Sequence, residues 1–366
     1  RYASLYPPLM GTLAAIATAS LLWIGTRSWL EAWSISLGTL TAFVLLFRSF
    51  FQPITALGDE WQTVQSALSG LERIFAVLAL PTAVEFKQEQ TQVQPYARPM
   101  TGAASTAAAI EVRNVIFGYQ PDQPVLQALS FDVAAGEQVA LVGRTGAGKS
   151  SVLNLLSGLY APWHGTVRVV GYDPYRLAED ARRSLIGVAP QMTQLFSGSV
   201  WENLTLGDQS VSLAEVTRAA ALTGAEALID ALPQGYATVL GIGSNGVQLS
   251  AGQRQLLTLT RALVWQPPVL LLDEATAAID SAGEAALRAA LRAGGEQRAV
   301  LIVAHRLATA RSTDRVIVLE AGCIIEEGAP AALIRRGGRF AALLELEAAG
   351  WDWRTAEAPL HFAKRL

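Results

Sequence analysis

An eight-residue run rich in glycine has the residue types needed to bind phosphate: Gly143-Arg-Thr-Gly-Ala-Gly148-Lys149-Ser150. It follows an apolar stretch, 138–142, and precedes a predicted helix over 151–156. Glycines at this spacing let backbone N–H groups close around phosphate oxygens, and the start of a helix adds a favourable dipole. Lys149 would reach the β- and γ-phosphates of a nucleotide, and Ser150 would hold Mg²⁺. The run predicts a nucleotide site without naming the reaction.

A second candidate element is an apolar strand, 269–272, that ends in the carboxylates Asp273 and Glu274. In α/β folds, ligands bind at the carboxyl ends of such strands. Asp273 fits an outer-shell partner of Mg²⁺, and Glu274 could polarise an attacking water, because phosphoryl transfer depends on positioning and charge stabilisation. A pair of this kind is common, so alone it is a weak signal.

Two further runs indicate a family. Leu249-Ser250-Ala251-Gly252-Gln253 opens a predicted helix before Asp273, and His305 follows the apolar strand 299–303. With these runs, residues 110–350 resemble the ATP-binding cassette of ABC transporters. That family is an α/β P-loop NTPase with an antiparallel β subdomain and a helical signature subdomain. The motifs stand in the family's order: Tyr119, the phosphate loop, Gln191, the signature run 249–253, Asp273 and Glu274, Asp280, and His305.

The resemblance implies a role for each matching residue. Glu274, His305 and Gln191 would act in hydrolysis, and Mg²⁺ would be held by Ser150, Gln191 and Asp273. The implied nucleotide contacts are Tyr119, Gly143, Thr145, Gly146, Gly148, Lys149, Ser150, Ser151, Asp273, Ser250, Gly252, Gln253 and Asp280. Tyr119, the adenine-stacking position, could also be a surface aromatic, and Gln191 could be a solvated loop residue. In this family two cassettes close head to tail around two ATP molecules, so Ser250 and Gly252 would contact the γ-phosphate in the partner's site.

The elements that must position these residues are short apolar runs. Residues 138–142, 185–188, 269–272, 299–303 and 316–319 are predicted strands of a largely parallel, buried sheet. The single cysteine, Cys323, excludes an intrachain disulfide and is predicted to lie in a strand. The net charge of −3 gives no electrostatic case for binding nucleic acid.

The first part of the chain has a different composition. Residues 2–26 and 32–47 carry no charge, and a membrane-spanning helix needs about 20 mostly apolar residues. The second window reaches that length only by continuing past Arg48, whose long stem could snorkel. A pair of buried helices in a soluble core is the alternative. After Pro53, apolar residues at heptad spacing predict a long stalk helix that packs on another helix, or an ordinary amphipathic core helix: Ile54, Leu57, Trp61, Val64, Leu68, Leu71, Phe75 and Leu78.

These features divide the chain into 1–86, a partial transmembrane domain; 87–109, a linker; 110–350, the ATP-binding domain; and 351–366, a C-terminal tail. The arrangement resembles the last two membrane helices and the cassette of a type I ABC exporter. The resemblance therefore implies about four further helices before Arg1, a multi-pass place in the inner (plasma) membrane, and a cassette in the cytoplasm. ATP hydrolysis would export an amphipathic drug, lipid or peptide. A non-transport or regulatory ABC ATPase is the alternative.

The signature run departs from the family's usual Leu-Ser-Gly-Gly-Gln, because Ala251 replaces the first glycine. Upstream, Gly243-Ser244-Asn245-Gly246 stands where exporters commonly have Gly-Glu-Arg-Gly. Heterodimeric bacterial multidrug exporters often have a subunit with an intact catalytic glutamate and an altered signature. The partner half-transporter is therefore expected to be a different chain, although a homodimer stays open.

Overall fold

The computed structural model describes residues 11–12, 15–20, 23, 36–79, 108–241, 246–273, 298–304 and 306–354. The chain divides into two compact units, Arg1–Gln88 and Glu89–Leu366.

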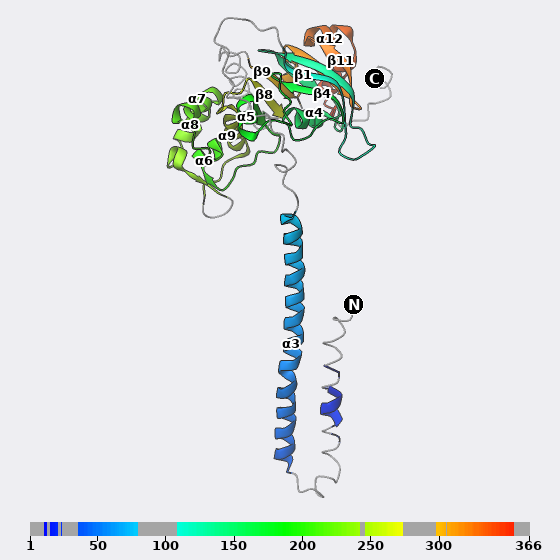
Figure 1. The fold of residues 1–366 in the computed structure, drawn as a ribbon, viewed down its shortest axis with the longest axis vertical. Coiled ribbons are helices and arrows are strands. Elements are labelled where there is room, and N and C mark those ends of the chain that lie inside the picture. The colour runs from blue at the N-terminus through cyan, green and yellow to red at the C-terminus, as the bar shows by residue number, and fades with distance from the viewer. Residues whose placement is uncertain are drawn as a thin grey trace. The chain divides into compact units, whose positions relative to one another are not determined.

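In the first unit the main element is one long helix, α3 (Leu37–Leu78), which begins after the N-cap Ser36 and continues through Pro53 (Figure 1). The described side chains of the predicted heptad seam are exposed, from 46% at Val64 to 72% at Leu78. Among the described residues, no helix combines the length and the apolar character that crossing a membrane requires. Most of the predicted first membrane window, 2–26, lies outside the described residues.

The second unit is built on a six-stranded sheet in which every neighbour pair is parallel except the edge pair β11–β10. Its strands, in spatial order, are β11 (Cys323–Gly328), β10 (Arg315–Glu320), β3 (Gln138–Val142), β9 (Ala299–Val303), β8 (Val269–Asp273) and β5 (Ile186–Ala189). All five predicted strands are present, each end within one residue of the prediction. Cys323 begins β11, as expected for a cysteine in a strand.

Both faces of this sheet are covered, which explains why its strands are apolar at nearly every position. On β3, Val139 and Leu141 belong to one core, whereas Ala140 and Val142 belong to another on the opposite face. The first core also contains a three-stranded antiparallel sheet of β2 (Leu126–Ala134), β1 (Ala108–Phe117) and β4 (His164–Val169). β1 begins at Ala108, within the segment 87–109.

The opposite face is covered by two groups of helices. A helical group packs on β8 and β9 and forms a core of its own: α6 (Val200–Thr205), α7 (Leu213–Thr223), α8 (Ala225–Asp230) and α9 (Ala251–Leu263). Figure 1 shows these helices gathered to one side of the sheet. Next to β3 and β10 lie α11 (Leu307–Arg311), α12 (Pro330–Arg336) and α13 (Arg339–Ala348).

Shorter elements connect these layers: α4 (Lys149–Leu156), α5 (Glu179–Leu185), β6 (Gly198–Ser199), the 3₁₀ turn η3 (Gly235–Ala237) and β7 (Val239–Leu240).

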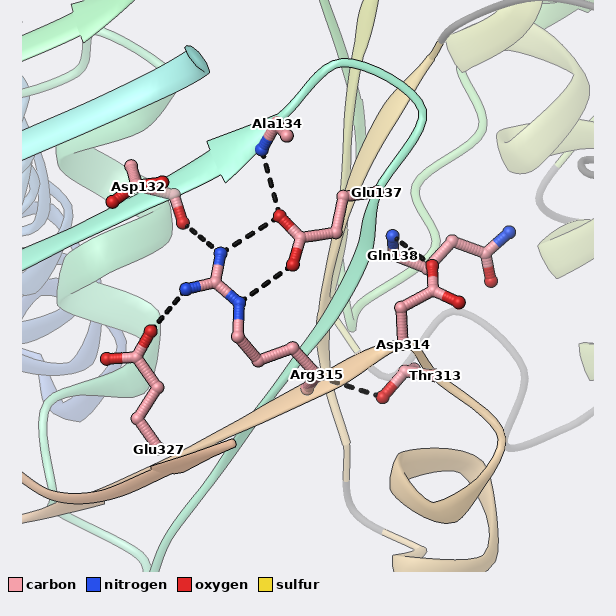
Figure 2. A network of polar contacts seen from close by, with 8 residues as sticks. All are labelled: Asp132, Ala134, Glu137, Gln138, Thr313, Asp314, Arg315 and Glu327. Carbon is pink, nitrogen blue, oxygen red and sulfur yellow. Dashed lines mark hydrogen bonds and ion pairs between the residues drawn. The ribbon is translucent and has the colours of Figure 1, made fainter. Parts of the chain in front are cut away.

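A polar network joins the antiparallel sheet to the central one (Figure 2). The Arg315 guanidinium on β10 donates to both carboxylate oxygens of Glu137, at 2.7 and 2.9 Å, and to the backbone carbonyl of Asp132 on β2 at 2.5 Å. It also forms an ion pair with Glu327 on β11. Burial alone would lower the pKa of Arg315, but the hydrogen bonds and charges of Glu137 and Glu327 raise it. The network therefore fixes the turn that leads into β3, the strand before the phosphate loop.

Candidate functional site

The carboxyl ends of four parallel strands place the candidate residues along one edge of the sheet. β3, β9, β8 and β5 are neighbours in that order. Leu141 on β3 lies opposite Val303 on β9, and Val303 lies opposite Asp273 on β8. The carboxyl ends of these strands therefore lie along one edge of the sheet, where α/β folds bind ligands. Glu274, His305 and Asp280 lie outside the described residues.

The phosphate loop takes a backbone shape that glycine allows. Gly146 and Gly148 have φ of +82° and +101°, in the left-handed region that side chains disfavour. A Cβ at Gly148 would also lie 2.6 Å from the Leu126 side chain. Gly148 caps the start of α4, whose first N–H groups have no partner within the helix. The loop therefore has the shape and the donors expected of an anion cradle.

Lys149 is 8% exposed and donates from Nζ to the carbonyls of Gly143, at 2.7 Å, and Arg144, at 2.9 Å. Burial lowers the pKa of Lys149, the charge of Asp273 acts to raise it, and the charge of Arg354 lowers it further. The structure thus places Asp273 within electrostatic reach of Lys149. It also brings Arg354 to them, a residue that the motifs did not predict.

Tyr119 lies against the start of α4. Its hydroxyl donates to Ser151 Oγ at 3.1 Å and accepts from Asn154 Nδ2 at 3.0 Å. Its ring packs edge-on against Phe117 and Tyr160, with centroids 5.1 and 5.3 Å away, while half of the residue stays exposed. Tyr119 is therefore a fixed aromatic beside the phosphate loop, with exposed surface that could contact a base.

The signature run forms the start of α9. Ser250 is the N-cap: its Oγ accepts from Gln253 N at 3.2 Å, and its N–H donates to Gln253 Oε1 at 2.8 Å. This reciprocal pair is a capping box. α9 belongs to the helical core, whereas the buried side chains of α4 belong to the core beneath the antiparallel sheet. Ser250, Gly252 and Gln253 thus stand on a different packing unit from Lys149.

Gln191 is exposed, two residues after β5. The chain beyond it is held to α9 by Arg261, which donates to the carbonyls of Gln194, at 3.0 Å, and Asn203, at 2.6 Å. Burial lowers the pKa of this arginine. The segment carrying Gln191 is therefore tied to the helix that carries the signature.

The donor set at the sheet edge suits a magnesium nucleotide. Mg²⁺ prefers oxygen ligands and is commonly held by one or two carboxylates together with phosphates. Ser150 is exposed at the start of α4, and Asp273 is close enough to Lys149 to affect its pKa. The Ser150 hydroxyl, the Asp273 carboxylate and the Lys149 ammonium beside a glycine-rich loop therefore fit both Mg²⁺ and a nucleotide.

Sequence reasoning missed Trp353 and Arg354, which fall in the segment predicted as a tail. The available signal was Trp351-Asp-Trp353, because two large aromatics next to charged residues are unusual in a solvated tail. Trp353 is 3% exposed.

Known proteins agree with this geometry. The sequence profile of the family described as ABC transporter matches residues 126–277. The mycobactin import ATP-binding/permease protein IrtB of Mycolicibacterium thermoresistibile is 37% identical over 346 residues, covering 94% of this chain and 56% of that protein. The ATP-dependent lipid A-core flippase of Syntrophus aciditrophicus is 33% identical over 344 residues, covering 94% and 55%.

A solved structure of a bacterial Atm1-family ABC exporter with ATP bound superposes with a TM-score of 0.63 at 31% identity. It matches 97% of this chain, which covers 59% of that structure. The chain therefore carries an ABC transporter ATP-binding domain, and its homologues are ABC transporter ATP-binding/permease proteins. These findings are consistent with ATP hydrolysis. The chain spans about half the length of the curated relatives it matches.

Proposed function

We propose that this chain is the ATP-binding and ATP-hydrolysing part of an ABC exporter that moves an amphipathic drug, lipid or peptide. The observation that supports this most directly is the convergence of the phosphate loop, Lys149 and Asp273 within a domain of the ABC transporter family. The relatives include proteins named as a lipid A-core flippase and a probable multidrug resistance ABC transporter.

In this proposal each residue at the sheet edge has a task. The backbone of Gly143–Ser150 and the ammonium of Lys149 hold the phosphates, and Tyr119 stacks on the base. Ser150, Asp273 and Gln191 hold Mg²⁺, which when bound neutralises phosphate charge. Glu274 orients the attacking water, and His305, two residues after β9 in the sequence, assists hydrolysis. Ser250, Gly252, Gln253 and Asp280 serve the composite site formed with a second cassette.

The whole exporter would be a dimer of half-transporters in the inner membrane. Residues 1–86 would supply the last membrane helices and a stalk, 87–109 a linker, and 110–350 the cytoplasmic cassette. The solved Atm1-family exporter, matched over 97% of this chain, supports an arrangement in which one polypeptide carries both parts.

Transport in inside-out membrane vesicles tests this function. The full-length protein should pump a fluorescent amphipathic dye into the vesicles only when Mg·ATP is present, and Lys149→Ala should abolish pumping. ATP hydrolysis without pumping of any dye, lipid or peptide offered would favour a non-transport ATPase. ATP binding without hydrolysis would favour a regulatory cassette.

Import is a second candidate, because IrtB is named as an import protein at 37% identity. The same vesicles distinguish the two directions. An importer should deplete mycobactin, the cargo in the name of IrtB, from preloaded inside-out vesicles, whereas an exporter should accumulate cargo in them.

A further inference from the structure

The end of the cassette turns back onto the phosphate loop. Helix α13 ends at Ala348, and Gly350, with φ of +79°, takes the left-handed conformation that stops a helix. The N–H of Trp351 then donates to the carbonyl of Leu346 at 3.0 Å. Three residues later, the carbonyl of Arg354 accepts a hydrogen bond from the N–H of Thr145, inside the phosphate loop, at 3.1 Å.

Trp353 anchors this return. It is 3% exposed and lies in the same core as Val142, the residue directly before the loop. Trp351, two residues earlier, is 51% exposed. One tryptophan of the pair is therefore buried and the other lies at the surface, which makes Trp351 a matched control for Trp353.

Arg354 brings a positive charge to the loop. Its guanidinium is aligned by a two-pronged ion pair with Asp352, at 2.8 and 2.9 Å. Asp352 also accepts from the N–H of Arg354 at 3.1 Å, which closes a tight turn. The hydrogen bond from the Thr145 N–H to the Arg354 carbonyl places this residue directly beside the phosphate loop. The guanidinium thus adds a positive charge next to the loop, which the Asp352 carboxylate offsets in part.

The loop is supported from two sides. The N–H of Gly322, in the turn between β10 and β11, donates to the carbonyl of Ala147 at 3.2 Å. Arg354 provides the second support at Thr145. A loop already held in its binding shape loses less conformational freedom when a ligand binds, so such supports raise affinity.

We propose that Trp353 and Arg354 belong to the nucleotide site of this chain, where Trp353 docks the C-terminal segment and Arg354 braces the phosphate loop and strengthens the binding of nucleotide phosphates. This inference rests on the proposed function, because it takes the nucleotide to bind at the Lys149 loop. No motif of the family's usual set reaches these two residues.

Titration calorimetry of the full chain with Mg·ATP and Mg·ADP tests the proposal. Arg354→Gln keeps the backbone carbonyl and removes the charge together with the ion pair to Asp352. The dissociation constant for ATP should rise about five- to tenfold, since an exposed charge interaction is worth roughly 1 kcal/mol. The effect should be smaller for ADP and should shrink at high salt, because exposed charges are screened.

Trp353→Ala should weaken both nucleotides and also lower thermal stability, because it leaves a cavity in the core. Trp353→Phe keeps the anchor apolar and should bind nearly as the wild type does. Trp351→Ala should leave both dissociation constants unchanged.

The outcomes separate this inference from the function on which it rests. If wild type binds ATP and Lys149→Ala does not, the loop is the nucleotide site, whatever the C-terminal variants do. Given that result, unchanged affinity in Arg354→Gln would refute a role for its charge. Tighter binding in Trp353→Ala would show that the segment covers the loop rather than supporting it, and would overturn the proposal.

Discussion

Lys149 is buried, and the two hydrogen bonds of its ammonium are to carbonyls of its own loop. Each can be exchanged for a bond to a phosphate oxygen, because an ammonium binds an anionic oxygen more strongly than a neutral carbonyl. Asp273 favours the charged ammonium, whereas burial and Arg354 oppose it. Lys149 is thus held at the site by hydrogen bonds to loop carbonyls, which a nucleotide phosphate can replace.

The first prediction at this scale concerns turnover. Glu274→Gln in the full-length protein should keep ATP binding but lower hydrolysis at least ~100-fold, in line with the loss of an aligned catalytic group. Lys149→Ala should instead weaken binding itself. Phosphate release and nucleotide binding, measured on the same preparations, check both. Near-normal phosphate release by Glu274→Gln would remove Glu274 from the proposed mechanism.

The second prediction concerns the base. Tyr119→Ala should raise the dissociation constant for ATP, because stacking on an aromatic is worth roughly 1–3 kcal/mol. Tyr119→Trp keeps an aromatic face and should bind ATP as tightly as wild type. Tyr119→Phe loses the hydrogen bonds to Ser151 and Asn154. It should therefore show a small loss that separates the role of the hydroxyl from that of the ring. Equal binding by Tyr119→Ala and wild type would make Tyr119 a surface aromatic.

Much of the candidate site could be predicted from the sequence, because motif residues such as Lys149 and Asp273 follow strands whose ends meet. The contact between Thr145 and Arg354 could not be predicted from the sequence. The two residues lie far apart in the chain and are joined by a backbone hydrogen bond, which any residue type could form. Likewise, the capping box of Ser250 shows that the signature serine also has a local folding task, which a motif alone does not reveal.

At the scale of elements, the strands were predictable to within a residue because burial on both faces makes them apolar throughout. Helix α3 was harder. Pro53 marks a change of pattern in the sequence, yet the helix continues through it to Leu78. A proline removes one backbone hydrogen bond and usually kinks or breaks a helix. In α3 the helical residues on both sides of Pro53 form one continuous element.

Capping boxes provide the third prediction. On α7, the Ser212 hydroxyl and N–H both donate to Glu215, at 2.7 Å, and these bonds lower the pKa of Glu215 from its ordinary value of 4.5. The carboxylate therefore stabilises α7 fully above pH 4.5, and this support is lost as the pH falls through the lowered value. Glu215→Gln should reduce the protection of α7 amides from hydrogen exchange at neutral pH, with no difference in strong acid.

The matched control is the same change in a Ser212→Ala background, which removes the hydroxyl but keeps the backbone N–H that donates to Glu215. There Glu215→Gln should have a smaller effect with the same pH dependence, and Ser212→Ala alone should cost about 1 kcal/mol of local stability. An effect of Glu215→Gln that is independent of pH would mean that the charge does not support α7.

At the scale of the whole molecule, the two proposed phosphate-binding surfaces of the cassette lie on separate cores. Lys149 starts a helix on one core, and Ser250 caps a helix on another. In the proposed dimer each surface would face a different nucleotide. A substitution in the signature would then affect the partner's site, and a substitution at the sheet edge would affect this chain's own.

The last prediction follows from that asymmetry. In the proposed dimer, Ala251 would alter the surface that this chain offers its partner, whereas the chain's own phosphate loop keeps the family pattern. In a heterodimer the competent site would combine Glu274 with the partner's signature, and the weaker site would use Ser250-Ala251-Gly252. Ala251→Gly should therefore change turnover by less than about tenfold, under ~1.4 kcal/mol, because the affected site contributes little. Glu274→Gln should silence the whole pump. Purifying the full-length chain alone and measuring its stoichiometry and ATPase activity decides the matter, since a stable, fully active homodimer would overturn the heterodimer and leave the proposed exporter standing.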